Sequence, residues 1–197
     1  MLVLWSVLCY GSGALPWSVW LGNLFFHVDP REQSDHNPGA ANAFRAAGWR
    51  LGAAVLVLDF LKAFIPVAAA HWLIGFPAAQ LAWLAFVPMV GHAFSIFLRF
   101  RGGRGIVVMF GVWAGLTLYS IPLVMGAAAI VATFLIRRDE YRTLAIPLVL
   151  IGYLLLRQAP SWTVLLACAQ LLVLAIKMGD FILKQRGQRA RKASDMQ

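Results

Sequence analysis

The chain has 197 residues, of which 61% are hydrophobic and 13% are charged. Ordinary soluble domains carry about 25% charged residues, so this composition excludes a soluble globular protein and predicts an integral membrane protein. The net charge is +9, but the basic residues lie in short connections and a tail and form no continuous stripe. This distribution excludes nucleic acid as the expected partner and favours membrane lipids.

Seven apolar stretches are suited to cross a bilayer as helices, which takes about 20 residues, or somewhat fewer inside a bundle. The sequence therefore predicts an all-α fold, a single membrane domain over residues 1–197 that ends in a basic cytoplasmic tail, 178–197. The predicted spans are 2–24, 51–72, 78–98, 105–118, 121–136, 143–156 and 162–177. The first contains Gly11, Gly13 and Pro16, which favour a kink and close packing. Residues 105–136 also fit one helix bent at Pro122.

Lysines and arginines distribute unevenly among the connections. Three arginines lie in each of the first, third and fifth connections (27–50, 99–104 and 137–142), and the second and fourth connections have none. Six more basic residues follow from Lys177 onward. Because positive charge marks the cytoplasmic side, the pattern predicts an outer N-terminus, a cytoplasmic C-terminus and an odd number of spans. The fifth connection, RRDEYR, otherwise has the composition of an ordinary solvated turn.

The first connection, residues 27–50, is too long for a simple hairpin link and is rich in polar and turn-forming residues. Asn37, Gly39 and Asn42 fall within six residues, and Arg45 follows. Amide donors, a glycine and a guanidinium can converge here on one small polar ligand. The alternative is a solvated loop that leads into a helix capped by Asn42.

Asp59 and Lys62 are ionisable residues inside the second predicted span. Charged side chains are costly at membrane depth. Because the two are three residues apart, they can face the same side of a helix and pair. They line a polar cavity or form an internal strut, and the sequence leaves both interpretations open.

The stretch 91–105, GHAFSIFLRFRGGRG, ends an apolar segment in a turn rich in arginine and glycine. Its arginines supply positive charge, and its glycines let backbone N–H groups approach a ligand. These residues are Arg99, Arg101, Arg104, Gly102, Gly103 and Gly105. The combination suits a phosphate. The alternative is a set of arginines that only anchor the topology.

His92 lies near the cytoplasmic end of the third span, close to the arginine cluster. It is a candidate polariser or proton partner, and the alternative is a hydrogen-bonding strut. The sequence has no HExxH or comparable ligand spacing and no GxSxG elbow. It therefore predicts no metal site, no cofactor and no activated nucleophile.

Three stretches resemble motifs of the bacterial acyl-phosphate-dependent glycerol-3-phosphate acyltransferase family, the PlsY type. GALPWSVW in the first span is similar to the family's GSIPFG. NPGAANAFRAAGWRLGAAVLVLDFLKAFIPV resembles GSGNxGATNxxRxxG followed by an apolar helix with aspartate and lysine. The clearest similarity joins GHAFSIFLRFRGGRG to GHxFPVFLxFKGGKG. The resemblance extends from about Gly13 to Gly115.

The resemblance implies a seven-span enzyme of the bacterial inner (cytoplasmic) membrane with its active site on the cytoplasmic face. Such an enzyme moves a fatty acyl group from acyl phosphate to the hydroxyl of glycerol 3-phosphate, or of a related polyol phosphate, in phospholipid synthesis. The products are lysophosphatidic acid and phosphate, and transfer is direct, without a covalent acyl-enzyme.

Family positions carry over onto residues of this chain and imply their roles. The implied catalytic residues are His92, Arg104 and Asn42. The implied substrate-binding residues are Asn37, Gly39, Arg45, Arg101, Gly102, Gly103 and Gly105. Asp59 and Lys62 are the implied structural polar pair.

The chain also departs from the family pattern in its cytoplasmic loops. Ser34, Asp35 and His36 replace Gly-Ser-Gly, and the Asp35 carboxylate repels a phosphate unless it is paired. Ala41 and Val108 stand where threonines are expected, so two hydroxyl donors are missing. Arg101 and Arg104 replace the two family lysines. They keep the positive charge but present a planar fork instead of a point charge.

The C-terminal motif HRxNIxRLLxGxE is the most altered. It aligns with KMGDFILKQRGQR, which places Lys177, Asp180 and Arg189 at the histidine, asparagine and glutamate positions and keeps only Gly187. The alternative function is therefore a non-catalytic membrane subunit or lipid-binding scaffold that retains the acyltransferase fold. A transporter is disfavoured because no inverted repeat is visible.

Overall fold

The computed structural model describes residues 1–33 and 35–194 of the chain. The described residues form helices and connecting loops and contain no strand, which agrees with the all-α prediction. The helices are α1 (Leu2–Ala14), α2 (Trp17–Leu21), α3 (Ala40–Ala68), α4 (Ala78–Ala93), α5 (Ile106–Thr117), α6 (Ser120–Leu135), α7 (Asp139–Leu156) and α8 (Ser161–Ser194). Residues 178–194 of the predicted tail belong to α8, and 195–197 lie outside the described residues.

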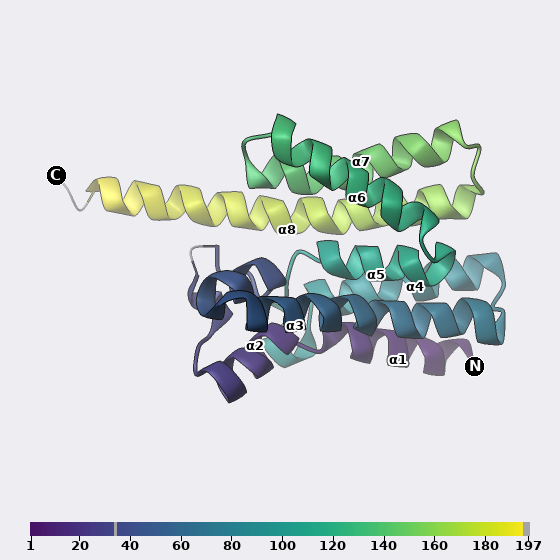
Figure 1. Cartoon of the computed structure of the whole chain (residues 1–197), viewed down its shortest axis with the longest axis horizontal. Helices are drawn as coiled ribbons and strands as arrows, with labels where there is room; N and C mark the ends of the chain where they lie inside the picture. The colour runs from purple at the N-terminus through teal and green to yellow at the C-terminus, as the bar shows by residue number, and fades with distance from the viewer. Residues whose placement is uncertain (34, 195–197) are drawn as a thin grey trace.

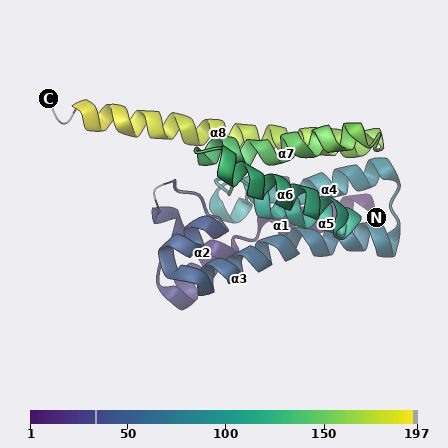
Figure 2. The same ribbon diagram turned by 45° about the horizontal axis from the view of Figure 1, so that its top comes forward.

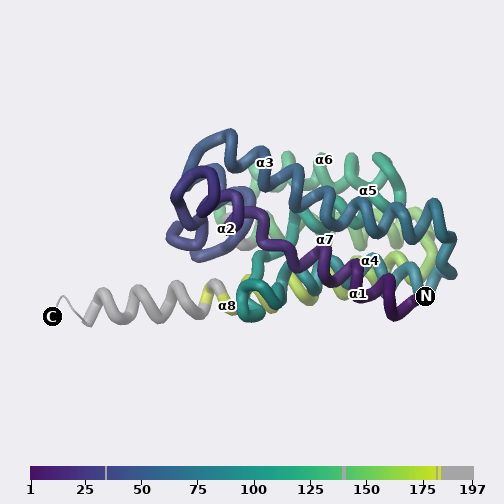
Figure 3. The backbone as a smooth tube through the Cα atoms, turned by 90° about the horizontal axis from the view of Figure 1, so that it is seen from below, coloured from purple at the N-terminus to yellow at the C-terminus, as the bar shows by residue number. Residues whose placement is uncertain are grey.

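The long helices follow one common axis (Figure 1). Helices α1, α3, α4 and α5 pack together, and α6, α7 and α8 lie along one side of that group, joined to it by contacts of α8 with α4 and of α6 with α5 (Figure 2). Seen from below, α1 and α3 lie side by side, with α2 at the end away from the N-terminus (Figure 3).

Successive long helices run in opposite directions, so the connections alternate between the two ends of the bundle. Connections 27–39, 94–105 and 136–138 lie at the left end in Figure 1, and the N-terminus lies at the right end. The three arginine-bearing connections therefore share one end, as an alternating topology requires. Which end faces the cytoplasm follows from the charge rule and stays a prediction.

Three helical segments of the described chain are long and apolar enough to cross a membrane: Ala40–Ile74, Ala78–Leu98 and Ser161–Asp180. Helix α1 and the segment Trp17–Phe26 make a fourth if their bend of 43° lies within one span. The other three predicted spans are shorter apolar helices, and α5 with 12 residues covers only about 18 Å of a hydrocarbon core about 30 Å thick. The count of seven spans stays a prediction.

The predicted kink in the first span is confirmed, since α1 ends at Ala14 and α2 begins after Pro16. The alternative prediction of a single bent helix over residues 105–136 is wrong. Helix α5 ends at Thr117, Leu118 adopts a φ of 57°, and α6 begins at Ser120. Pro122 lies in the first turn of α6, where its missing N–H breaks no helical hydrogen bond.

The second span begins earlier than predicted, because α3 starts at Ala40 instead of residue 51. The helix is interrupted at Ala47 and Gly48, where Gly48 has a φ of 71°, a left-handed conformation that glycine adopts without a Cβ clash. The short helical segment before this break carries Asn42 and Arg45, and the long segment after it runs along the bundle (Figure 1).

The core is apolar and includes the fully buried Trp113, Leu84, Met89 and Leu174. Within it, the Trp113 indole N–H donates to Gln170 Oε1 at 2.8 Å. Large apolar side chains such as Phe134, 85% exposed, cover the outside. That pattern suits a protein whose surface faces lipid.

Candidate active site

The first connection is held together by Asn42, whose side chain is fully buried. Its Nδ2 donates to the Asp35 carboxylate and to the Asn37 carbonyl oxygen (2.9 Å), and its Oδ1 accepts from Arg45 Nη1 (2.7 Å). The alternative that Asn42 caps a helix is wrong, because Gly39 occupies the N-cap position of α3. Asn42 lies in the first turn and ties the loop to the helix.

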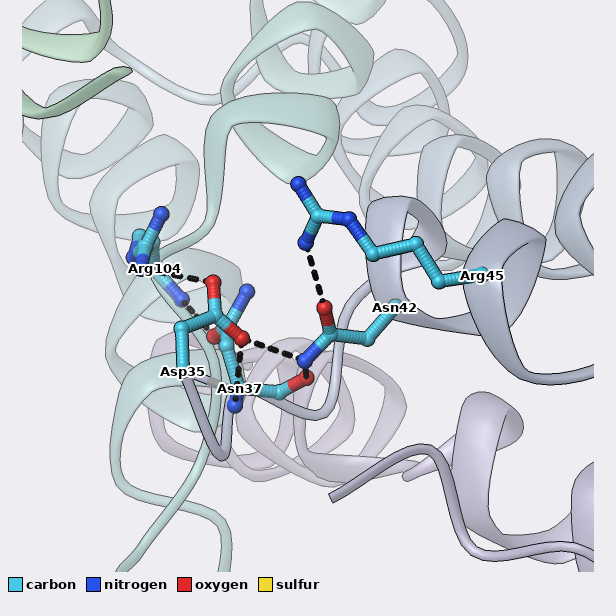
Figure 4. Close-up of polar contacts among 5 residues, drawn as sticks. All are labelled: Asp35, Asn37, Asn42, Arg45 and Arg104. Atoms are coloured by element: carbon cyan, nitrogen blue, oxygen red, sulfur yellow. Dashed lines mark hydrogen bonds and ion pairs between the residues drawn. The ribbon is translucent and has the colours of Figure 1, made fainter. Parts of the chain in front are cut away.

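Asp35 and Asn37 join this connection to the arginine and glycine turn, 69 and 67 residues further along the chain (Figure 4). The Asp35 carboxylate pairs with Arg104 Nη2 at 2.8 Å. Asn37 Oδ1 accepts from the Arg104 backbone N–H at 3.2 Å. The two motifs that the sequence singled out therefore meet at the end of the bundle, and the carboxylate expected to repel a phosphate is paired.

Gly102 and Gly103 have a different role from the one predicted. Their backbone N–H groups donate to the carbonyl oxygens of Ala93 and His92, at 3.1 Å each, so neither N–H points at a ligand. A Cβ at Gly102 would overlap the His92 carbonyl oxygen, and a Cβ at Gly103 would overlap His92 Nε2. These glycines are required because the turn lies directly against the end of α4.

The Asp59 and Lys62 pair is an internal strut that extends to the histidine. Lys62 Nζ lies 2.6 Å from Asp59 Oδ1 and 2.9 Å from both the Leu15 carbonyl oxygen and His92 Nδ1. The side chains of Asp59, Lys62 and His92 are all buried. Because an ammonium only donates, Nδ1 accepts, and we assign the hydrogen of the neutral ring to Nε2. From the sequence, the pair could either form an internal strut or line a polar cavity. Asp59 does both, because it also lines the cavity described next.

A cavity of about 360 Å³ lies where these elements meet. This volume is within the usual range for small-molecule sites, about 300–1,000 Å³. Its walls come from the first connection, the start of α5, and helices α6 and α7. The predicted residues that line it are Asn37, Gly39, Arg45, Asp59, His92, Arg104 and Gly105.

Some predicted residues lie outside this cavity. Arg101 is exposed, and Asn42, Lys62, Gly102 and Gly103 support the walls without lining them. Arg101 belongs to the turn after α4, in which residues 99–101 are all exposed.

The cavity is also lined by three residues that were not predicted from the sequence, Arg142 and Thr143 on α7 and Thr133 on α6. Arg142 was assigned to an ordinary solvated turn. The available signal was its place in a connection on the same predicted membrane side as Arg45 and Arg104. The alternation of charge predicts on which side a connection lies, but it does not predict which of the three connections on that side meet in a single pocket.

Arg45, Arg104 and Arg142 supply guanidinium groups to one cavity that also contains a histidine and an asparagine. Guanidinium forks match the geometry of phosphate and carboxylate oxygens. Among the described residues, no three histidine, cysteine, aspartate or glutamate side chains converge as a metal site would need. The fold and the cavity together define a helical membrane protein with a polar pocket, lined by three arginines and two aspartates, at one end of the bundle.

The chain belongs to the glycerol-3-phosphate acyltransferase family, whose model matches residues 3–184. A glycerol-3-phosphate acyltransferase of Fusobacterium nucleatum is 40% identical over 118 residues, which are 60% of this chain and 58% of that protein. One of Pseudomonas aeruginosa is 35% identical over 140 residues, 71% of this chain and 72% of the relative. One of Thermotoga maritima is 41% identical over 100 residues, 50% and 49% of the two chains. The aligned part is thus between about half and three quarters of each relative.

The fold is that of PlsY, an integral membrane glycerol 3-phosphate acyltransferase. The crystal structure of PlsY in its glycerol 3-phosphate form superposes with a TM-score of 0.85 at 23% identity, covering 95% of this chain and 93% of PlsY. The lysophosphatidic acid form gives a TM-score of 0.82 at 21% identity, with the same coverage. The family model over residues 3–184 confirms the suspected family, and the superposition adds that the fold is shared with an integral membrane protein.

Proposed function

We propose that this protein transfers a fatty acyl group from acyl phosphate to the hydroxyl of glycerol 3-phosphate or a related polyol phosphate, at the cytoplasmic face of a bacterial inner membrane. The observation that carries the proposal is the cavity in which Arg45, Arg104 and His92 meet, in a chain of the glycerol-3-phosphate acyltransferase family. With glycerol 3-phosphate as the acceptor, the products are lysophosphatidic acid and inorganic phosphate.

The reaction joins two anionic substrates, so its main requirements are positioning and charge stabilisation. The acceptor hydroxyl oxygen forms the new ester bond to the carbonyl carbon while the bond from that carbon to the donor phosphate breaks. The hydroxyl proton passes to a phosphate oxygen. Guanidinium groups such as Arg45 and Arg104 offset the negative charge on the acceptor and on the departing phosphate, and no covalent acyl-enzyme is required.

His92 is the proposed polarising group. The contact from Lys62 Nζ to His92 Nδ1 at 2.9 Å leaves Nε2 as the hydrogen-bearing nitrogen of a neutral ring. In that form the ring donates a hydrogen bond and does not accept a proton through Nε2. Its proposed role is thus to stabilise developing oxygen charge next to the glycine turn, and Asp59 and Lys62 hold it in that orientation.

An apolar cavity between α6 and α7 offers room for the acyl chain. It has a volume of about 460 Å³ and is lined by apolar residues alone. Ala128 and Ala132 line it, while the next residues along α6, Ala129 and Thr133, line the polar cavity. One helix thus borders a site for a polar head and a site for a hydrocarbon chain, as an acyl phosphate needs.

The test is to incubate the purified full-length protein with palmitoyl phosphate and labelled glycerol 3-phosphate and to measure labelled lysophosphatidic acid. We expect product, and we expect Arg104→Ala to reduce its rate by about 100-fold or more, the scale of losing one charge-stabilising donor. Arg50→Ala is the matched control, because Arg50 is exposed on α3 and does not line the cavity.

Absence of product with glycerol 3-phosphate and with other polyol phosphates overturns the enzymatic function. The altered C-terminal motif, with Lys177 at the position of a histidine, then favours the non-catalytic scaffold. In this structure Lys177 Nζ donates to the Ala93 carbonyl oxygen at 3.0 Å and lies over the Phe94 ring, contacts that hold α8 against α4 in either case.

A further inference from the structure

The Asp35 carboxylate occupies a set of donors that resembles an anion site. It accepts from Arg104 Nη2 at 2.8 Å, from the Asn37 backbone N–H at 3.2 Å and from Asn42 Nδ2 (Figure 4). The side chain is 12% exposed and lies on the wall of the polar cavity. A cationic fork, a backbone N–H and an amide thus already bind one negatively charged group, which the chain supplies itself.

A phosphate entering this cavity needs donors of the same kinds. Arg104 is the guanidinium that contacts Asp35, and this hydrogen bond uses the fork that would otherwise meet a phosphate oxygen. A dianion beside the carboxylate also experiences like-charge repulsion, which is strong where little water penetrates. The incoming anion must therefore displace Asp35 or bind next to it, and both weaken binding.

We propose that Asp35 is a specificity-determining residue of the acceptor pocket, a resident carboxylate that competes with the acceptor's phosphate for Arg104. It lowers the affinity for dianionic phosphate acceptors and favours an acceptor head with less negative charge, whose hydroxyls can donate to the carboxylate. The inference rests on the proposed function, because it assumes that the acceptor binds in this cavity.

A purely structural role for Asp35 predicts the opposite result. The ion pair with Arg104 links two connections that are far apart in the sequence, so a strut would hold the pocket in shape. Removing a strut loosens the pocket and weakens phosphate binding, whereas removing a competitor strengthens it. The sign of the change in affinity separates the two roles.

The experiment measures binding of inorganic phosphate and of glycerol 3-phosphate to the full-length protein in detergent by isothermal titration calorimetry. Asp35→Asn keeps the shape and removes the charge, and Asp35→Ser keeps a short polar side chain. We expect both variants to bind either ligand about tenfold more tightly than the wild type, which corresponds to about 1.4 kcal/mol.

Asp29→Asn is the matched control. Asp29 lies in the same connection and its removal changes the net charge equally, but it pairs with Arg31 outside the cavity. This pair is partly exposed, so its charges are screened, and we expect a change of less than about twofold. A similar gain in affinity for this control would assign the effect to net charge and overturn the inference.

Unchanged or weaker phosphate binding by Asp35→Asn and Asp35→Ser also overturns it. If the wild type makes lysophosphatidic acid while neither variant binds phosphate more tightly, the inference alone fails. If the variants bind phosphate more tightly but no form of the protein transfers an acyl group, the proposed function alone fails. The melting temperature of each variant identifies a folding defect, and the variant that folds then decides.

Discussion

Replacing Lys62 by methionine removes the centre of a buried polar network that joins three segments of the chain. Lys62 Nζ contacts Asp59 on its own helix, the Leu15 carbonyl oxygen between α1 and α2, and His92 on α4. The side chains of Lys62 and Asp59 are only 2% and 4% exposed. Removing one partner of a buried ion pair costs about 3–5 kcal/mol, because the other charge stays buried without compensation.

The melting temperature in detergent measures this cost. A change of 1 kcal/mol moves the midpoint by about 2–4 °C in a chain of this size, so we expect Lys62→Met to melt about 6–20 °C below the wild type. Asp59→Asn combined with Lys62→Met leaves no buried charge, so the double variant should recover part of the loss. His92 loses its partner at Nδ1 in both variants, and acyl transfer should fall in both.

A midpoint for Lys62→Met within about 2 °C of the wild type would refute this reasoning, since it would mean that water reaches Asp59 or that the two charges are not coupled. A double variant no more stable than Lys62→Met would refute it as well, because the uncompensated Asp59 charge would then not be the source of the loss.

Two further predictions concern the turn after α4 and the pH dependence of the first connection. Gly102→Ala should destabilise the protein by about 1–3 kcal/mol and reduce acyl transfer, because the added Cβ would overlap the His92 carbonyl oxygen. Gly126→Ala in α6 is the control and should have neither effect, because no atom lies within 4 Å of its added Cβ. Equal melting curves for the two variants would contradict the assigned role of Gly102. The Arg31 guanidinium lowers the pKa of Asp29 below its ordinary value of 3.8, so the pair stabilises the folded state above about pH 4 and loses this contribution as the pH falls through the lowered pKa. Because the pair is partly exposed, Asp29→Asn should cost less than about 1 kcal/mol at pH 7, and this cost should shrink as the pH falls through the lowered pKa. Denaturation at neutral and at acidic pH measures it, and the same loss at both would exclude an electrostatic origin.

Features that depend on local sequence were predictable. Apolar length and the alternation of basic connections indicated an all-helical membrane protein, and the break near Pro16 followed from residues next to it. The pairing of Asp59 with Lys62 was predictable for the same reason, since residues three apart on a helix face one side. The family motifs identified the two segments that the structure brings together around Arg104.

Contacts between distant segments depended on the tertiary structure. The sequence by itself indicated that residues 27–50 and the arginine and glycine turn within 91–105 lie at the same end of a helical membrane protein and resemble acyltransferase motifs. Only the packing of the helices decided that Asp35 holds Arg104 across 69 residues, that Lys62 orients His92, and that Arg142 joins the pocket. It also decided that the N–H groups of Gly102 and Gly103 bind α4 instead of a ligand. The physical reason is that hydrogen bonds and ion pairs act only at contact distance, and a periodic pattern fixes which face a residue occupies but not which distant residue it meets there.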